Sequence, residues 1–210
     1  QRGSLVGLFS FDNPEVVRLE PANAPATGSM NVTIFGANFG IYSNYKHKAV
    51  LGVRPCATST WSSDSSITCE PAPFTGNSFR MGIDALLDPA TNEFLLRSVS
   101  VRSPMMSYDR PHITAFVPAT APTTAGVLIT AIGSNFGSEL CGGDCKGFTQ
   151  VALVLGDTLC ANTAWIADSS MVCALAAFPS RGPGVGQDLP PKMVVGKQPN
   201  DADIISFCFD

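Results

Sequence analysis

The sequence predicts an all-β protein made of two similar β-sandwiches that follow one another along the chain. One observation is an internal repeat, because segment 11–40 recurs without a gap as segment 108–137. Another is the content of turn-forming residues, with 19 Gly and 16 Pro among 210 residues, which suits many short strands. The last is that no stretch shows a convincing helical period.

The two copies match at residues that control local backbone geometry. At an offset of 97, the run Gly36-Ala37-Asn38-Phe39-Gly40 matches Gly133-Ser134-Asn135-Phe136-Gly137. Further along, the offset rises to 104, because the second copy contains extra residues. At that offset the matched pairs are Gly52 and Gly156, Cys56 and Cys160, Trp61 and Trp165, Asp64 and Asp168, and Cys69 and Cys173. Self-similarity over this length predicts two copies of one structural unit.

A third short pattern marks the ends of the copies. It reads Phe9-Ser10-Phe11-Asp12, then Met106-Ser107-Tyr108-Asp109, then Phe207-Cys208-Phe209-Asp210. We therefore expect the end of a preceding repeat or a linker over 1–10, a first domain over 11–107, a second over 108–207, and the start of a following junction over 208–210. On this interpretation the chain is expected to be a window of a longer array. A natural C-terminus that happens to copy the junction is the alternative.

The expected strands follow from alternation and from turn residues. Met30, Val32 and Ile34 alternate with polar residues, which is typical of a half-buried strand. Further strands are expected at 48–53, 80–87 and 94–101, with a turn at 88–92. Copies of about 100 residues built this way have the size of immunoglobulin-like sandwiches.

One strand of the second copy breaks the alternation. Segment 127–132 reads Val-Leu-Ile-Thr-Ala-Ile and is apolar on both faces. Strands of this kind are usually covered on both sides. We expect a loop of the same repeat to cover it, and a neighbouring chain or repeat is the alternative.

Composition excludes several classes of protein. Charged residues are 14% of the chain, the net charge is −4 and the isoelectric point is about 5.1. This balance argues against nucleic-acid partners, which require a clustered basic surface. No run of about 18 apolar residues occurs, so we expect no direct membrane insertion of this segment.

The sequence offers no constellation for catalysis. Its two histidines, His47 and His112, lie outside recognisable nucleophile or metal motifs, and the common hydrolase, phosphate-binding and zinc-protease motifs are absent. Two acidic pairs, Asp201 with Asp203 and Glu139 with Asp144, do not form a dense calcium loop. We expect no enzyme activity, no cofactor and no metal.

The combined pattern resembles the IPT/TIG domain. Each copy opens with Pro-x-[Ile/Val], continues through a strand that ends in Gly-x-Asn-Phe-Gly, and then carries two cysteines thirteen residues apart. The resemblance covers nearly the whole chain twice and implies an immunoglobulin-like fold. IPT/TIG domains occur in plexins, Met-type receptors, fibrocystin-like proteins and many protist surface proteins. The Phe of the motif, Phe39 or Phe136, is expected to plug the end of the sandwich.

The seven cysteines fit a disulfide framework outside the cytosol. Cys56 and Cys69 recur at the same spacing as Cys160 and Cys173, and Cys141 and Cys145 form a third close pair. We expect these six to be disulfide-bonded, because zinc would require a second ligand pair near Cys141. Cys208 is expected to be a buried free thiol, or to pair with the next repeat or another chain.

The same framework leads to an expected function and location. Asn31-Val32-Thr33 is the only N-glycosylation sequon, so Asn31 is a possible glycan site. We expect an extracellular or cell-surface structural and adhesion module, a rod-like array whose partners are its neighbouring repeats and other protein chains or glycans. Receptor stalks and surface filaments, including those on protist flagella, are built this way. The alternative is a receptor segment that binds a glycan or protein through the second-copy inserts 139–148 and 179–191. A further alternative is a DNA-binding protein of the Rel type, and the acidic net charge argues against it.

Overall fold

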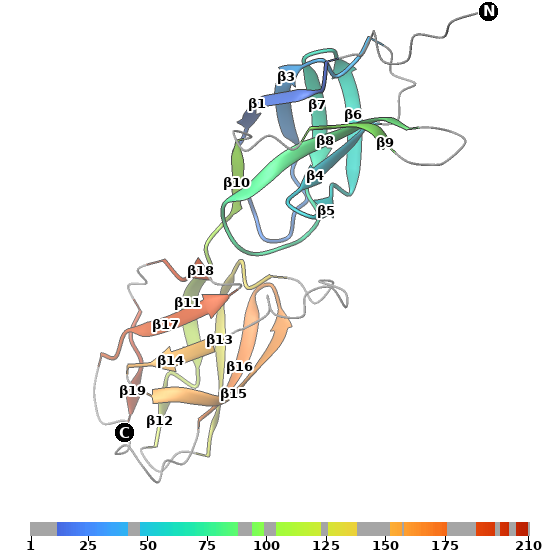
Figure 1. Cartoon of the computed structure of the whole chain (residues 1–210). Helices are drawn as coiled ribbons and strands as arrows, with labels where there is room; N and C mark the ends of the chain where they lie inside the picture. Colours follow the sequence, from blue (N-terminus) through green and yellow to red (C-terminus); the bar gives the residue numbers. More distant parts are fainter. Residues whose placement is uncertain are drawn as a thin grey trace, which may run out of the picture. The chain divides into compact units, whose positions relative to one another are not determined.

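The computed structural model describes residues 12–41, 47–87, 94–98, 104–122, 126–137, 152–156, 158–175, 188–195, 198–201 and 205–209 (Figure 1). Every regular element in these ranges is a β-strand, so the all-β prediction is confirmed. The chain forms two compact units. Unit 1 consists of Gln1–Ala22, Asn31–Pro71 and Phe79–Met106, and unit 2 consists of Asn23–Met30, Ala72–Ser78 and Ser107–Asp210.

Unit 1 contains an antiparallel four-stranded sheet and a second group of strands. The first sheet has the order β1 (Glu15–Glu20), β3 (Val32–Ala37), β7 (Ser66–Glu70) and β6 (Thr58–Ser63). In the second group, β8 (Phe79–Leu87) pairs with β4 (Lys48–Leu51), β9 (Phe94–Ser98) and the start of β10 (Met105–Tyr108), while β5 (Arg54–Pro55) pairs with β4. Alternate residues of these strands are fully buried, including Ile34, Ile67 and Ile83.

Unit 2 repeats this plan in one continuous path of strands. The order is β11 (His112–Val117), β13 (Leu128–Ser134), β16 (Ser170–Leu175), β15 (Thr158–Ala167), β14 (Ala152–Leu155), β17 (Pro191–Val195) and β18 (Gln198–Pro199). The long strand β15 pairs with β14 at its start and with β16 along the rest. One strand therefore takes part in both groups.

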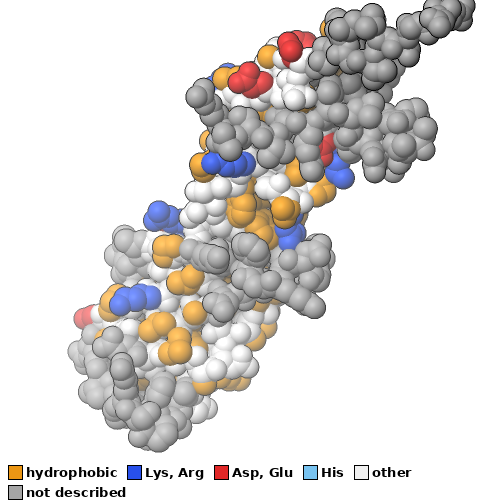
Figure 2. Space-filling model, in the orientation of Figure 1, with side chains coloured by type: hydrophobic (Ala, Val, Ile, Leu, Met, Phe, Trp, Pro, Cys, Tyr) orange, Lys and Arg blue, Asp and Glu red, His pale blue; other side chains and the backbone are white. Residues whose placement is uncertain are grey.

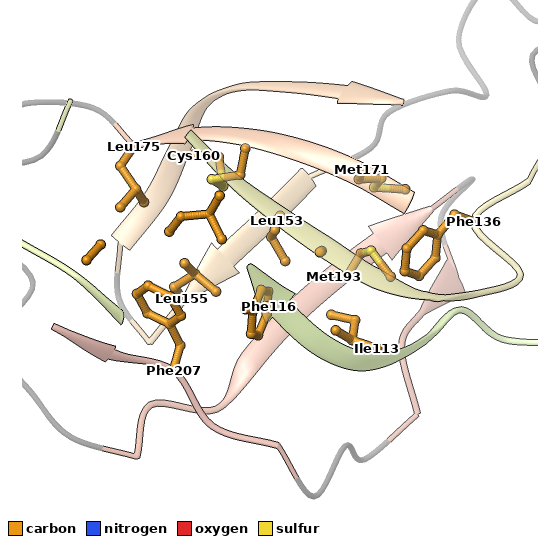
Figure 3. Close-up of a cluster of buried hydrophobic side chains, with 14 of the residues drawn as sticks. Ile113, Phe116, Phe136, Leu153, Leu155, Cys160, Met171, Leu175, Met193 and Phe207 are labelled. Carbon is orange, nitrogen blue, oxygen red and sulfur yellow. A yellow bond between two sulfur atoms is a disulfide. The ribbon is translucent and has the colours of Figure 1, made fainter. Parts of the chain in front are cut away.

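The core of unit 2 lies between these strands. Ile113 and Phe116 of β11, Leu153 of β14 and Met193 of β17 are buried together, beside the sulfur atoms of the disulfide (Figure 3). Phe207 contacts Phe116 edge-on, with ring centroids 5.5 Å apart. The burial of these apolar side chains supplies the main stabilising term of such a sandwich.

The junction pattern of the sequence forms the same pairing twice. The end of β10 pairs in parallel with β2 (Asn23–Ala24), with Ser107 opposite Asn23. In the same way β19 (Cys208–Phe209) pairs in parallel with β12 (Thr120–Ala121), with Cys208 opposite Thr120. The residues that follow the two copies thus have equivalent places.

The strands differ from the expected ranges in one respect. The strand expected at 48–53 ends at Leu51, because Gly52 has a φ of 63° and begins the turn into β5. Among the described residues no loop covers the outer side of 127–132, where the Leu128 side chain is 64% exposed, and the expected cover stays a prediction. The turn at 88–92 and the end of the strand at 94–101 lie outside the described residues.

Candidate functional site

The structure contains two disulfides at the cysteines that share a spacing. Cys56 is bonded to Cys69 with a Cα–Cα distance of 5.8 Å, and Cys160 is bonded to Cys173 at 5.5 Å. All four side chains are buried. Cys56 directly follows β5 and is bonded to β7, whereas Cys160 on β15 is bonded to the neighbouring strand β16.

The remaining cysteines have different outcomes. Cys208 lies half-buried on β19 and is bonded to no cysteine that the structure describes. Cys141 and Cys145 lie outside the described residues, so their expected pairing stays a prediction.

The Gly-x-Asn-Phe-Gly runs, here called the corners (36–40 and 133–137), have nearly identical geometry. Phe39 and Phe136 are each 1% exposed, which agrees with the expected plug. Asn38 and Asn135 have φ values of 63° and 59°, in the left-handed region that Asn tolerates. A side chain at Gly36 would overlap the Glu15 backbone oxygen at 1.9 Å, so this position requires glycine. Gly133 meets the His112 oxygen at the same distance.

An aspartate holds each corner, a role that sequence comparison alone did not assign. Asp64 Oδ1 accepts a hydrogen bond from Gly40 N at 2.9 Å, and Asp168 Oδ1 accepts one from Gly137 N at the same distance. Asp168 Oδ2 also accepts from Asn135 N at 3.4 Å. The recurrence of Asp at the 104 offset was the signal that could have found this contact.

The first corner also carries a histidine and a tryptophan. The ring Nε2 of His47 hydrogen-bonds the carbonyl oxygen of Phe39, and Trp61 Nε1 donates to the oxygen of Gly40 at 3.2 Å. The two rings stack with centroids 6.4 Å apart. His47 therefore supports backbone structure in this corner.

Within unit 2, the segments 23–30 and 72–78 are hydrogen-bonded to Asn135 of the second corner and to Gln198 of β18. Asn135 Oδ1 accepts from Ala26 N at 3.3 Å. The buried Gln198 accepts from Gly76 N at 3.0 Å and donates to the Tyr108 oxygen at 2.6 Å. Both ends of a buried amide are thus satisfied, as burial of a polar group requires.

The four-stranded sheet of unit 1 and strands β11, β13, β16 and β15 of unit 2 share their register. In unit 1, Arg18 lies opposite Phe35 and Thr33 lies opposite Thr68. At the matched positions of unit 2, Ala115 lies opposite Ile132 and Thr130 lies opposite Val172. Opposed residues of an antiparallel sheet point to the same side. Residues at matched positions therefore form equivalent outer faces.

These outer faces have opposite chemistry. The outer face of the first repeat is polar and charged, and consists of Arg18, Glu20, Asn31, Thr33, Phe35, Thr58, Thr60, Ser66, Thr68 and Glu70. The outer face of the second repeat is uncharged and mostly apolar, and consists of Ala115, Val117, Leu128, Thr130, Ile132, Asn162, Ala164, Ser170, Val172 and Ala174. On the first face, the Arg18 guanidinium lies 4.0 Å from the Phe35 ring centroid and pairs with Glu20.

The possible glycan site lies on the polar face. Asn31 is exposed and directly precedes β3, and Thr33 of the sequon is half-buried in that strand. A glycan at Asn31 would extend from the charged side of the sheet. The matched residue in the second copy is Leu128.

The described residues form no metal-binding cluster. No group of three His, Cys, Asp or Glu lies close enough among them to hold an ion. Asp201 forms an exposed ion pair with Arg110 at 3.8 Å, whereas Asp203, Glu139 and Asp144 lie outside the described ranges. None of the described residues belongs to a helix of the length and hydrophobicity that crossing a bilayer requires.

Comparison with known families gives two matches in tandem. The family model for the IPT/TIG domain matches residues 14–85 and again residues 111–200. Both corners and all four bonded cysteines fall inside these ranges.

Among solved structures, the chain is similar to several multidomain surface proteins. A surface glycan-binding protein of Prevotella bryantii is 10% identical, with a TM-score of 0.50 over 92% of this chain and 42% of that one. The extracellular region of plexin A4 is 19% identical, with a TM-score of 0.39 over 93% and 18%. The Yersinia pseudotuberculosis adhesin InvE is 11% identical, with a TM-score of 0.43 over 88% and 55%. The chain spans less than two thirds of each of these proteins, and at these identities the glycan-binding protein shows a shared fold alone.

Proposed function

The chain belongs to the IPT/TIG domain family, and on this premise we propose that it is a non-catalytic extracellular module for structure and adhesion. IPT/TIG and immunoglobulin-like domains are non-catalytic kinds of domain. We propose that the two copies, 11–107 and 108–207, are consecutive repeats of a rod-like array in a cell-surface or filament-forming protein.

The repeated junction is the observation that carries this proposal. The parallel pairing of β19 with β12 has the same form as that of β10 with β2. Phe209 therefore occupies in the second copy the place that Tyr108 occupies in the first. Pro111 follows Asp109 and Arg110, and proline restricts both its own backbone and that of the preceding residue. Short, restrained connections of this kind suit a spacer.

An extracellular or cell-surface location is supported by the two disulfides. Disulfides persist in oxidising compartments and are rare in the cytosol. Each closes a loop with a sequence separation of 13 and so stabilises a small sandwich. Neighbouring repeats, other protein chains and glycans are the proposed partners.

Small-angle X-ray scattering of the intact chain tests the array proposal. A spacer predicts an elongated particle, with a maximum dimension close to that of two sandwiches joined end to end. A compact globule in which the two repeats lie side by side would contradict it. The same profile in high salt would show that the shape does not depend on surface charge.

A second candidate function is ligand binding through the loops that only the second copy contains. Binding residues are often carried by irregular loops on a rigid scaffold. The inserts 139–148 and 179–191 are absent from the first copy, and almost all of their residues lie outside the described ranges. Titration with a panel of soluble β-glucans tests this candidate, with a chain lacking 179–187 as the control. Binding that survives the deletion, or no binding at all, would count against it.

A further inference from the structure

We infer that the segments 23–30 and 72–78 of the first repeat form a docking surface for the second repeat, and that this docking makes the stability of each repeat depend on the other. Segment 23–30 lies between β1 and β3, and segment 72–78 lies between β7 and β8, so both belong to the first repeat by sequence. In the folded protein both belong to unit 2. The inference deepens the proposed array, on which it rests for its setting, by naming the surface that one repeat offers to the next.

The buried Gln198 on β18 provides one half of the docking. Its side chain is 3% exposed. Its Oε1 accepts a hydrogen bond from Gly76 N at 3.0 Å, and its Nε2 donates to the Tyr108 oxygen at 2.6 Å. A buried N–H or amide oxygen that loses its partner destabilises the folded state. Removal of segment 72–78 would therefore leave the Gln198 oxygen without the donor that now satisfies it.

The amide of Asn135 in the second corner provides the other half. In the first corner, Asn38 Nδ2 donates to the Asn13 oxygen at 3.4 Å. In the second corner, Asn135 Nδ2 donates to the Arg110 oxygen at the same distance. Asn135 Oδ1 also accepts from the N–H of the fully buried Ala26 at 3.3 Å. Both corners thus use the amide nitrogen within their own repeat, and in the second corner the amide oxygen receives the docking segment.

Packing closes the same surface. A Cβ built on Gly137 would lie 2.8 Å from Thr75 Cγ2, so the Thr75 methyl group packs directly on this glycine. Gly137 is buried, whereas its match in the first corner, Gly40, is half-buried. Phe74 N donates to the Ala26 oxygen at 2.9 Å and so joins the two docking segments to each other. The segments therefore present one continuous surface to the second corner.

The docking contacts use neutral groups, so hydrogen bonding and shape select the partner. Backbone N–H groups of the docking segments meet the amide oxygens of Asn135 and Gln198. On the described part of the face shown in Figure 2, Lys and Arg side chains lie scattered rather than in one patch. A charged ligand finds no matching group among these contacts. The partner that fits is a repeat whose corner Asn and whose buried Gln place two amide oxygens against the docking segments.

Docking of this kind contributes free energy that is lost when either repeat unfolds. Unfolding of the first repeat releases the strands that hold both ends of each docking segment. Unfolding of the second repeat removes Gln198 and the corner. Opening of either repeat therefore requires its own unfolding free energy and the docking free energy, as in repeat proteins with nearest-neighbour coupling. A substitution that weakens docking from one side should consequently lower the stability of the other side as well.

Hydrogen–deuterium exchange of the intact chain, read by mass spectrometry of its peptides, tests the proposal. Amide exchange reports the free energy of the opening that exposes each strand. Q198A, in the second repeat, should speed exchange in β3 and β7 of unit 1 by about fivefold, the factor for one lost hydrogen bond. N200A is the matched control, because the half-buried Asn200 amide bonds Met193 N and the Pro191 oxygen within the second repeat. It should speed exchange in β16 and leave unit 1 unchanged.

A second variant tests the opposite direction. T75A removes the methyl group that packs on Gly137 and should speed exchange in β13 and β16 by about fourfold, the factor for one buried methyl group. T68A, at a half-buried threonine on β7, is its control and should leave β13 and β16 unchanged.

The outcomes separate docking from a local structural role. Near-UV circular dichroism establishes that each variant is folded. If Q198A or T75A changes exchange only in the repeat that carries it, or if a control acts on the other repeat as strongly, the docking proposal is wrong. Independent repeats in an elongated particle would leave the array standing, so the two proposals fail separately.

Discussion

The two repeats share their internal frame and differ on their surface. The disulfide, the buried Phe of the corner and the aspartate that holds the corner occur in both, with equal distances at the main contacts. The outer sheet faces have almost no side chain in common. The frame is what the fold requires, because removing any part of it would open the core or free the backbone. The fold tolerates either chemistry on these faces, because the same register forms with charged outer residues in one copy and uncharged ones in the other.

Replacing the corner phenylalanines, Phe39 or Phe136, is expected to cause the largest loss of stability in each repeat. F39A and F136A each remove a buried ring and should lower the free energy of unfolding by about 3–5 kcal/mol. Equal losses are expected, since the two rings are equally buried. Urea unfolding followed by tryptophan fluorescence measures both, because Trp61 and Trp165 report one repeat each. A loss under about 1 kcal/mol in either repeat would break the equivalence of the corners.

Removing one disulfide is expected to cause a loss of stability of similar or slightly smaller size. Replacing both cysteines of one bond by serine, C56S/C69S or C160S/C173S, should destabilise that repeat by about 3 kcal/mol, because each bond closes a loop of similar length. Unfolding midpoints without reductant measure the effect. C208S serves as the control and should change little, since Cys208 has no bonded partner among the described cysteines. A cost confined to one repeat would show that the bonds are not equivalent.

Replacing Asp64 or Asp168 is expected to cause smaller losses of stability that differ between the two repeats. Asp168 accepts two backbone hydrogen bonds and is half-buried, whereas Asp64 accepts one from Gly40 and is exposed. We expect D168A to cost about 2 kcal/mol and D64A about 1 kcal/mol, at roughly 1 kcal/mol for each hydrogen bond. Thermal unfolding distinguishes the two. The reverse order would mean that the side-chain contacts do not set the stability of the corners.

The glycan site gives the smallest effect on stability. The protein secreted from eukaryotic cells should lose one glycan when treated with a glycosidase, and N31Q should remove that shift in gel mobility. The unfolding free energy should change by less than about 0.5 kcal/mol, because Asn31 is exposed. A glycan retained on N31Q would place the modification elsewhere. If the wild-type protein carries no glycan, the proposed glycosylation of Asn31 is wrong.

Much of the frame was predictable because it repeats in the sequence. The all-β class, the burial of Phe39 and Phe136 and the two bonded cysteine pairs all follow from matched spacings. The roles of Gly36 and Asp64 were not predicted, because one depends on an approach to the Glu15 backbone and the other on a hydrogen bond between distant residues. The only sequence signal for either contact is that the residue recurs at the matched position of the second copy.

The surface was harder to predict for a different reason. The apolar pattern of 127–132 indicated cover on both sides, but hydrophobicity alone does not say whether a loop or another chain supplies it. The loops 23–30 and 72–78 show the same limit. Their hydrogen bonds to Asn135 and Gln198 connect residues more than a hundred positions apart, and place both loops in unit 2.

The most direct test of the shared frame is a thiol count on the native, unreduced protein, with peptide mapping of its crosslinks. The account predicts a bond between Cys56 and Cys69 and a bond between Cys160 and Cys173. It also predicts at most one free thiol, at Cys208, if Cys141 and Cys145 pair as proposed. Seven free thiols would contradict the disulfide-stapled frame and, with it, the extracellular location.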